Sequence, residues 1–495
     1  MRLASHLDNR ILSPLVAAPR RALLATLLAA IALTAINHPT SLTATPAATP
    51  SHDGVITPAQ ITTAPITVPN NRAPLTGTVF ARHGRTLTRV IGAHIGTGEQ
   101  TLQTDAMGRF TLPPADRTGA ISVVAPGYRI LRTHPTADAA IFLLEPIDVR
   151  AVYLPYSRLG SAATRDWALN LARDGVVNAF VIDVKHENGS VLSLVANDTA
   201  WAFGAVRDPA PDIDQFLAEL GRLNIYRIAR VVTFLDTSLA LGAPDTALRT
   251  TDNTIFRDAL DLAWTSPFTE TARRHNIEIG VNAAQYFDEI QYDYVRLPTD
   301  ANVALRYQTT ADQRTDAIAR FAADAAQALH TAGAAISIDT FGLTTVVTDD
   351  QGIGQILEKI APSLDYYSPM VYPSTWATGW FDLDYPAADP FRVVHDSIAA
   401  AVGRIAATAA QTNAPSTTIV RPWLQDFHDY GARKLFYGAD QVALQIGAAA
   451  AAGGRGFMLW DASLEYELEP LNAAVAATPP PTDPTAAARV GAVAR

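Results

Sequence analysis

The chain has 495 residues, which is too long for a single ordinary domain. Because 48% of the residues are hydrophobic and 17% are charged, the composition excludes a protein that is disordered throughout. Its formal net charge of -10, without a cluster of Lys and Arg, argues against binding to a nucleic-acid backbone. The absence of Cys excludes disulfides, thiolate catalysis and Cys-ligated zinc.

Near the amino terminus, two arginines precede the apolar segment 22–36, whose length suits the hydrophobic region of a signal peptide. We predict that residues 1–36 are a signal peptide or a signal-anchor, so that the chain is extracytoplasmic, either secreted or anchored in the membrane through 22–36. A buried helix is the alternative. Thr, Pro and Ala dominate residues 37–73, which predicts an extended linker, and residues 473–495 are predicted to be a disordered tail.

Residues 74–148 contain short apolar segments separated by turn residues, which predicts a small all-β sandwich. The predicted strands are 75–80, 90–95, 101–104, 109–112, 121–125 and 140–144. Asp105 and Gly108 fit a tight hairpin, because such a turn needs an Asx-type start and a residue that tolerates positive φ.

Two segments of this domain, Thr-Asp-Ala-Met-Gly-Arg-Phe at 104–110 and Val-Ala-Pro-Gly-Tyr at 124–128, resemble the carboxypeptidase regulatory-like, transthyretin-type sandwich. Such domains lie beside many exported enzymes, and the resemblance is confined to this part of the chain. A spacer is the favoured role, with ligand binding as the alternative.

From 149 to 472, short apolar segments alternate with helical patterns, which is typical of βα units on a parallel sheet. A capping-box pair, Thr310 and Gln313, predicts the start of a helix over 310–332, and Gly333 predicts its end. Eight strands close a (β/α)8 TIM barrel. An open doubly wound sheet is the alternative, but no glycine-rich phosphate loop follows a predicted strand. The strands are 151–156, 179–184, 225–234, 289–294, 335–340, 366–372, 418–423 and 456–460.

Barrel enzymes carry their catalytic groups at the carboxyl ends of the strands. Side chains alternate along the fourth strand, so Glu289, Gln291 and Asp293 point inward and Asp293 lies at the rim. For Glu289, a filled core layer is an equally good interpretation. Asp339 ends the neighbouring strand in the same way, and adjacent strands are about 4.8 Å apart. Asp293 and Asp339 are therefore the predicted catalytic pair, within reach of the roughly 5 to 5.5 Å separation in retaining glycosidases.

Further polar and aromatic groups at the rim are predicted to bind substrate. Asp183 and Lys185 end the second strand, where an internal ion pair between them is the alternative. Arg296 could keep Asp293 ionised or bind a substrate oxygen, or it could pair only with loop carbonyls. Trp460 beside Asp461 suits a sugar subsite, although a Trp there could be packing alone. The predicted substrate-binding residues are Asp183, Lys185, Gln291, Arg296, Tyr372, Gln425, Trp460 and Asp461.

Six motifs resemble, in chain order, those of a bacterial family of proposed glycoside hydrolases that was long classed as a domain of unknown function. The most specific is Phe-Asp-Glu-Ile-Gln-Tyr-Asp-Tyr-Val-Arg-Leu-Pro at 287–298. The resemblance covers about 150–470 and implies an α-amylase-like barrel with a carbohydrate substrate and Asp293 as nucleophile or anion stabiliser. Tyr286 and Leu297 replace the usual Gly and Phe, and neither change removes a carboxylate. The other motifs lie at 178–189, 228–232, 365–374, 421–427 and 459–463.

The function predicted from these observations is hydrolysis of a glycosidic bond in an envelope or extracellular polysaccharide, with Asp339 as the leading acid/base candidate. A glycan-binding barrel without activity and another barrel hydrolase, such as a polysaccharide deacetylase, are the alternatives. The eleven His residues form no His-x-His or His-Glu-x-x-His pair, so neither a metal nor another cofactor is predicted. The predicted partner is a carbohydrate, and no nucleic acid is expected.

Overall fold

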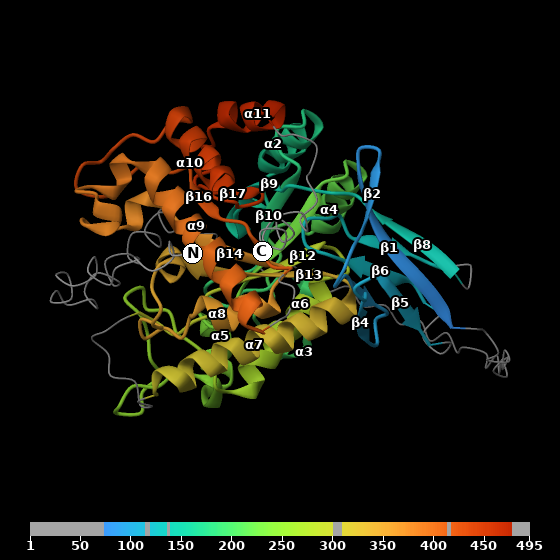
Figure 1. Ribbon diagram of the computed structural model, residues 1–495. Coiled ribbons are helices and arrows are strands. Elements are labelled where there is room, and N and C mark those ends of the chain that lie inside the picture. The colour runs from blue at the N-terminus through green and yellow to red at the C-terminus, as the bar shows by residue number, and fades with distance from the viewer. Residues whose placement is uncertain (1–73, 114–118, 136–138, 300–308, 413–416, 478–495) are drawn as a thin grey trace.

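The fold consists of a small β-sandwich followed by a closed barrel, as the sequence predicts (Figure 1). The computed structural model describes residues 74–113, 119–135, 139–299, 309–412 and 417–477. The predicted leader, the linker and nearly all of the predicted tail lie outside the described residues. The last helix, α11, continues to Ala477, so the first residues of the predicted tail are helical.

Two four-stranded sheets of the sandwich pack on one apolar core to which Val79, Ile95 and Phe142 contribute. Pairing is antiparallel except between β1 and β8. Two strands escaped prediction, β2 and β7, because they are short and carry no buried apolar side chain. One sheet contains β1 (Leu75–His83), β2 (Thr86–Arg89), β5 (Arg109–Leu112) and β8 (Ala139–Leu144), and the other β3 (His94–Gly96), β4 (Thr101–Gln103), β6 (Ile121–Val124) and β7 (Leu131–Thr133).

The predicted hairpin is confirmed. Oδ1 of Asp105 accepts hydrogen bonds from the backbone N–H groups of Met107 and Arg109, both at 2.8 Å. Gly108 has a φ of 69°, a conformation that a residue without Cβ adopts readily. The likeness of the whole domain to carboxypeptidase regulatory-like sandwiches stays a prediction.

Eight parallel strands form the barrel, which closes where β17 pairs with β9. The seventh strand is divided into β15 and β16 because Pro422, which has no N–H group, lies between them. In chain order the strands are β9 (Arg150–Leu154), β10 (Ala179–Lys185), β11 (Tyr226–Val232), β12 (Glu289–Asp293), β13 (Ala335–Phe341), β14 (Tyr366–Met370), β15 (Ile419–Val420), β16 (Trp423–Gln425) and β17 (Phe457–Trp460).

Helices surround the barrel and cover its outer apolar face (Figure 1). The longest predicted helix is confirmed as α7, with a capping box between Thr310 and Gln313 and a left-handed Gly333 after its last turn. The α-helices are α2 (Ala162–Arg173), α3 (Asp198–Ala202), α4 (Ile213–Arg222), α5 (Thr237–Gly242), α6 (Glu270–Ala283), α7 (Ala311–Ala332), α8 (Leu357–Ile360), α9 (Pro390–Thr412), α10 (Ala439–Ala451) and α11 (Leu468–Ala477).

Separate apolar clusters occupy the outer and inner faces of the barrel strands. Ile290 and Tyr292 of β12 belong to the outer cluster beneath the helices, and Tyr292 meets the ring of Phe321 on α7. Val181 and Met458 belong to the inner cluster. The predicted alternation along β12 is therefore confirmed, with Glu289, Gln291 and Asp293 on the inner face.

The sandwich packs against the amino-terminal ends of the barrel strands, at the opposite end from the mouth. The backbone N–H of Gly127 donates to the hydroxyl of Tyr366 at 2.9 Å, and Arg132 pairs with Asp288 at 3.0 Å. The imidazole of His94 stacks on that of His330 with ring centres 3.5 Å apart. The sandwich thus lies at the bottom of the barrel, away from the carboxyl ends of the strands.

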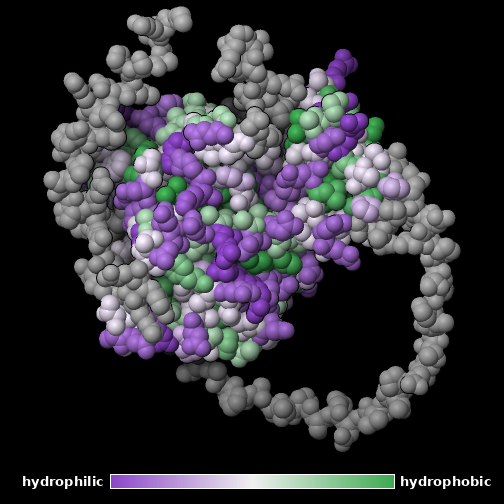
Figure 2. Space-filling view, turned by 60° about the horizontal axis from the view of Figure 1, so that its bottom comes forward, coloured by the Kyte–Doolittle hydropathy of each residue, from purple (hydrophilic) through white to green (hydrophobic). Residues whose placement is uncertain are grey.

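Over the described part of the chain, every helix is too short or too polar to cross a lipid bilayer. Hydrophilic residues alternate with several separate apolar areas on the face of the molecule in Figure 2. The apolar segment 22–36, on which the predicted anchor depends, lies outside the described residues.

Candidate active site

At the barrel mouth, Arg230 of β11 connects carboxylates from three places in the chain. Its Nε and Nη2 donate to Oδ2 of Asp293 on β12 at 3.0 and 2.7 Å. Its Nη1 donates to Oδ1 of Asp183 on β10 at 2.8 Å, and Nη2 also reaches Glu187 at 3.1 Å. Such charge-assisted bonds favour ionised carboxylates, whereas burial raises the pKa of Asp183, so one buried cation lies among three carboxyl groups.

Asp293 is further fixed by the backbone that follows it. Its Oδ1 accepts a hydrogen bond from the N–H of Tyr294 at 2.6 Å, and Tyr294 has a φ of 53°. A positive φ at a large aromatic residue is strained, and such strain is frequent at functional sites. The carboxylate of Asp293 is therefore held from both of its oxygens.

Asp339 of β13 lies beside Asp293 in a different environment. The register pairs Tyr292 with Ile338, which places the two acids at the same level on neighbouring strands. Nε1 of Trp423 donates to Oδ1 of Asp339 at 2.7 Å. Burial and the negative charge of Asp293 raise the pKa of Asp339 well above its usual value, which favours the protonated form of this acid.

Aromatic rings enclose these acids. The ring of Trp460 stacks on Tyr153 with centres 4.1 Å apart, and the guanidinium of Arg230 lies 5.3 Å from the Trp460 ring. The Tyr153 hydroxyl donates to Asp183 at 2.6 Å. Burial and the charges of Asp339 and Asp293 raise the pKa of Tyr372 well above its usual value, so the phenol stays neutral. The mouth thus combines an anionic centre with flat apolar walls.

Lys185 does not point into the barrel, contrary to the prediction from alternation. A β-bulge after Asp183 shifts the register, so that Lys185 pairs with Val231, an outward-facing position. Its ammonium binds Asp236 at 2.9 Å and the carbonyl of Val232 at 2.6 Å in the buried loop region after β11. The alternative of an internal pair with Asp183 is also wrong, because Asp183 pairs with Arg230.

Arg296 and Gln291 lie near the mouth, and within the described part of the chain neither side chain forms a hydrogen bond to Asp293. The guanidinium of Arg296 is 4.8 Å from the ring of Trp264 and donates to the carbonyl of Leu297 at 3.1 Å. This is the loop-carbonyl arrangement that the sequence left open. Gln291 is fully buried one layer below Asp293, and its amide donates to Met458 Sδ at 3.3 Å.

Gln425 and Asp461 support loops at the mouth. The Gln425 amide donates to Ser374 Oγ at 2.7 Å and its oxygen accepts from the Ser374 N–H at 3.0 Å. Asp461 accepts hydrogen bonds from the N–H groups of Ser463 and Glu465 at 2.8 and 3.1 Å, while burial raises its pKa. These bonds order the loops after β14 and β17 around the predicted substrate site.

Glu289 belongs to a filled core layer, one of the two interpretations that the sequence allowed. It forms an ion pair with Arg421, accepts from Ser337 Oγ at 2.5 Å and from the Tyr226 hydroxyl at 3.1 Å. Glu289 and Arg421 are completely buried. A carboxylate with these partners stabilises the barrel rather than facing substrate.

Arg230, Glu187 and Tyr153 were absent from the predicted site. The signal for Arg230 was available, because a charged residue within the apolar strand Ile-Ala-Arg-Val-Val must be paired when buried. Glu187 follows the bulge in β10, where alternation no longer predicts direction. Burial opposes its ionisation, but His186 and Arg230 lower the pKa of Glu187 to about 2.

A group of residues with the composition of a metal site, His94, His330 and Asp365, lies at the other end of the barrel. His330 contacts Asp365 at 2.9 Å, and its ring is stacked on that of His94. In-plane lone pairs of stacked rings point along parallel planes and do not converge on one ion. This cluster connects the sandwich to the barrel and gives no support to metal chemistry at the mouth.

Known proteins share this sequence pattern and fold to different degrees. Residues 151–466 match the family described as "Putative glycosyl hydrolase domain". No curated protein matches the chain. A hypothetical protein from Ruminiclostridium thermocellum is 28% identical over 38% of this chain and 96% of its own, with a TM-score of 0.35.

Two further solved structures are more distant in sequence. The PgaB (BpsB) glycoside hydrolase domain from Bordetella bronchiseptica is 12% identical, with 66% of this chain and 96% of that chain covered and a TM-score of 0.47. A chitinase from Chromobacterium violaceum is 15% identical, with 66% and 98% covered and a TM-score of 0.38. The family match spans the whole barrel, and this chain therefore belongs to the glycosyl hydrolase domain family that the six motifs indicate.

Proposed function

We propose that this protein hydrolyses a glycosidic bond with Asp339 as general acid and Asp293 as nucleophile or anionic stabiliser. The observation that carries the proposal is the contrast between two inward acids on neighbouring strands. Arg230 donates two hydrogen bonds to the carboxylate of Asp293, whereas burial and that negative charge raise the pKa of Asp339 and favour its protonated form. Glycosidases need such a pair, with one acid for the leaving oxygen and one anion for the sugar.

Proton transfer from Asp339 would assist departure of the leaving group. A protonated carboxyl in an apolar pocket gives up its proton when negative charge develops on the glycosidic oxygen. The Trp423 N–H that binds Oδ1 of Asp339 then stabilises the carboxylate that remains. This bond also fixes the orientation of the acid before reaction.

Asp293 would act on the positive charge that develops at the sugar ring. The oxocarbenium-like transition state of glycoside hydrolysis is cationic, and the carboxyl groups of Asp183, Glu187 and Asp293 all pair with Arg230 at the mouth. A negatively charged Asp293 favours this transition state over the neutral substrate.

A sugar chain is the proposed substrate because aromatic side chains follow the strands on the mouth side. Trp376, Trp380 and Phe381 form a cluster after β14, with ring centres of Trp376 and Phe381 4.7 Å apart. Nε1 of Trp376 is buried and has no hydrogen-bond partner within the described ranges. The leader predicted at 1–36 supports an envelope or extracellular polysaccharide as the source.

The test measures new reducing ends released from a panel of bacterial envelope and extracellular polysaccharides by the full chain. Asp293→Asn and Asp339→Asn should each lower turnover by about 100-fold or more. Asp324→Asn, an exposed position on α7, is the matched control and should leave turnover unchanged. NMR of the first product would show whether the anomeric configuration is retained or inverted.

Two results would contradict the proposal. Full activity of Asp293→Asn would remove that residue from the mechanism. Binding of a glycan with no release of reducing ends over a long incubation would instead indicate a barrel that recognises carbohydrate without cleaving it.

A further inference from the structure

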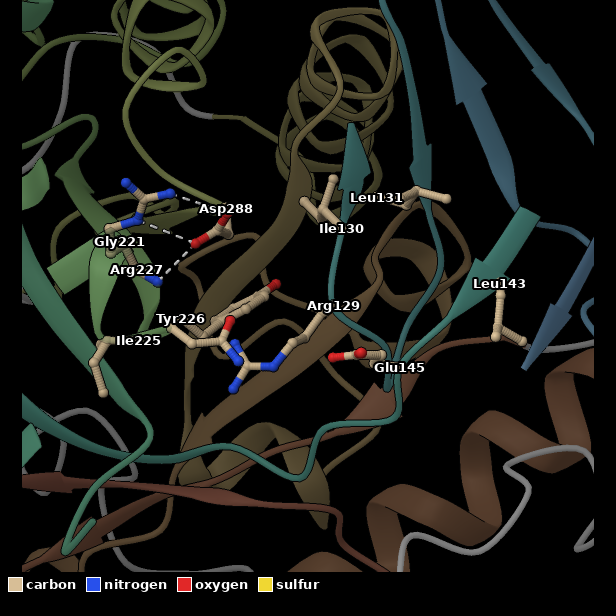
Figure 3. Close-up of a pocket in the computed structure, with 11 residues that line it drawn as sticks. Arg129, Ile130, Leu131, Leu143, Glu145, Gly221, Ile225, Tyr226, Arg227 and Asp288 are labelled. Carbon is tan, nitrogen blue, oxygen red and sulfur yellow. Dashed lines mark hydrogen bonds and ion pairs between the residues drawn. The ribbon is translucent and has the colours of Figure 1, made fainter. Parts of the chain in front are cut away.

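A polar cavity of about 260 Å³ lies between the sandwich and the bottom of the barrel, far from the catalytic acids. The sandwich contributes a wall that follows β6 and includes part of β8, and the barrel contributes the segment from α4 to β11 (Figure 3). Drug-sized ligands occupy about 300 to 1,000 Å³, so this volume suits one smaller molecule. The lining residues are Arg129, Ile130, Leu131, Leu143, Glu145, Gly221, Asn224, Ile225, Tyr226, Arg227 and Asp288.

Arg129 is the unusual member of this lining. Its backbone N–H donates to the carbonyl of Glu145 at 2.8 Å, but its guanidinium makes no hydrogen bond or ion pair with any described residue. In Figure 3 the guanidinium extends from the sandwich toward Tyr226 on the barrel. Burial lowers the pKa of Arg129, and the charges of Asp288 and Glu145 only partly oppose this effect.

The carboxylate of Asp288 is already hydrogen-bonded to other residues. Asp288 accepts hydrogen bonds from the Arg227 backbone N–H at 3.0 Å and from its Nε at 3.3 Å, and it pairs with Arg132 at 3.0 Å. Two cations therefore share one anion. Glu145 is exposed at the rim of the cavity, so the interior has an excess of positive charge in a chain whose net charge is -10.

We propose that this cavity binds a small hydroxylated carboxylate of the size of one hexuronic acid. The Arg129 guanidinium matches the planar carboxylate with two parallel hydrogen bonds. Ile130, Leu143 and Tyr226 offer an apolar surface to the C–H face of a sugar ring. The exposed Asn224 and Glu145 can bind its hydroxyl groups.

A site in this position would be separate from hydrolysis. It uses the sandwich, which the sequence favours as a spacer, together with the end of the barrel that is opposite the mouth. Acidic sugars bound there would hold an anionic glycan against the protein while another part of it reaches the acids. The inference does not depend on the proposed catalytic pair.

The experiment measures binding of D-glucuronic acid to full-length protein carrying Asp339→Asn, so that hydrolysis cannot contribute. Ligand-detected NMR, with glucose and inorganic phosphate as competitors, gives the affinities. Arg129→Met should weaken the binding of glucuronic acid at least tenfold. Leu143→Trp, which fills the cavity without removing charge, should weaken it by a similar factor. Arg85→Ala, at an exposed arginine of the same sandwich, should leave binding unchanged.

Several outcomes would overturn this assignment. Equal affinity for glucose would show that the carboxylate is not recognised, and equal affinity for inorganic phosphate would show that the sugar is not. Unchanged binding by folded Arg129→Met, with a thermal midpoint like that of Arg85→Ala, would place any binding elsewhere. Loss of catalysis in the Asp293→Asn test bears on the mouth alone, so the two proposals fail separately.

Discussion

Arg230 and Asp293 are joined by two hydrogen bonds to a single carboxylate oxygen, from Nε at 3.0 Å and from Nη2 at 2.7 Å. The remaining edge of the same guanidinium binds Asp183 at 2.8 Å. Because the guanidinium is planar and its donors are fixed, this arrangement sets the carboxylates of β10 and β12 relative to each other. Arg230 thus acts as a positioning residue for the proposed anion at the sugar ring.

Arg230→Lys should impair both stability and turnover. An ammonium on a flexible stem cannot span Asp183 and Asp293 together, so at least one buried carboxylate loses a donor. We expect a loss of about 1 to 3 kcal/mol in the free energy of unfolding and a fall in kcat of at least tenfold. Urea unfolding and reducing-end assays measure the two effects, with Arg109→Lys, at an exposed side chain of β5, as control. Unchanged kcat would mean that another group orients Asp293.

The pH dependence of hydrolysis should report Asp339. Burial and the charge of Asp293 raise its pKa well above the usual value, so the protonated form that donates to the leaving group persists to higher pH than in an exposed aspartic acid and is then lost. The rate should therefore fall on the alkaline side. Asp339→Asn should remove this alkaline limb. The substitution should also slow hydrolysis of an aryl glycoside with a good leaving group far less than hydrolysis of the natural glycan, because such a leaving group needs no proton. An alkaline limb that persists in Asp339→Asn would assign it to another group.

Glu289→Gln should destabilise the barrel without changing the shape of the pH profile. The substitution leaves the completely buried Arg421 without its anion, and breaking such a pair costs about 3 to 5 kcal/mol. Denaturant unfolding measures the loss, with Asp324→Asn on α7 as the control. If the folded variant instead showed a pH–rate profile shifted to higher or lower pH, Glu289 would take part in catalysis.

Much of this architecture follows from local patterns in the sequence. Alternation places Asp293 and Asp339 on the inner face, because the opposite face of a barrel strand must meet helices. The same rule misplaces Lys185, since a bulge adds one residue and reverses the direction of those that follow. Alternation alone also does not identify Arg230 as a site residue, because the role of this buried cation depends on carboxylates that other strands supply. Packing of the sandwich on the barrel bottom depends on contacts between distant segments, such as Arg132 with Asp288.

His94 should make the protein less stable in acid. Burial, and then the neighbouring His330, lower the pKa of His94 to about 4, from about 6.5 in an unfolded chain, although Asp365 opposes this. The folded state therefore takes up a proton less readily than the unfolded state. The resulting stabilisation is complete above about pH 6.5 and is lost as the pH falls toward 4.

The variant His94→Phe tests this, because it retains a ring that can stack on His330 but cannot titrate. Between pH 7 and pH 4.5, both proteins should lose stability, and the loss in free energy of unfolding should be about 1 to 2 kcal/mol smaller for His94→Phe than for the native protein. His275, whose pKa burial also lowers to about 4, is present in both proteins, and its contribution cancels in this difference. Equal losses of stability in the two proteins would show that His94 takes up its proton as readily in the folded chain as in the unfolded one.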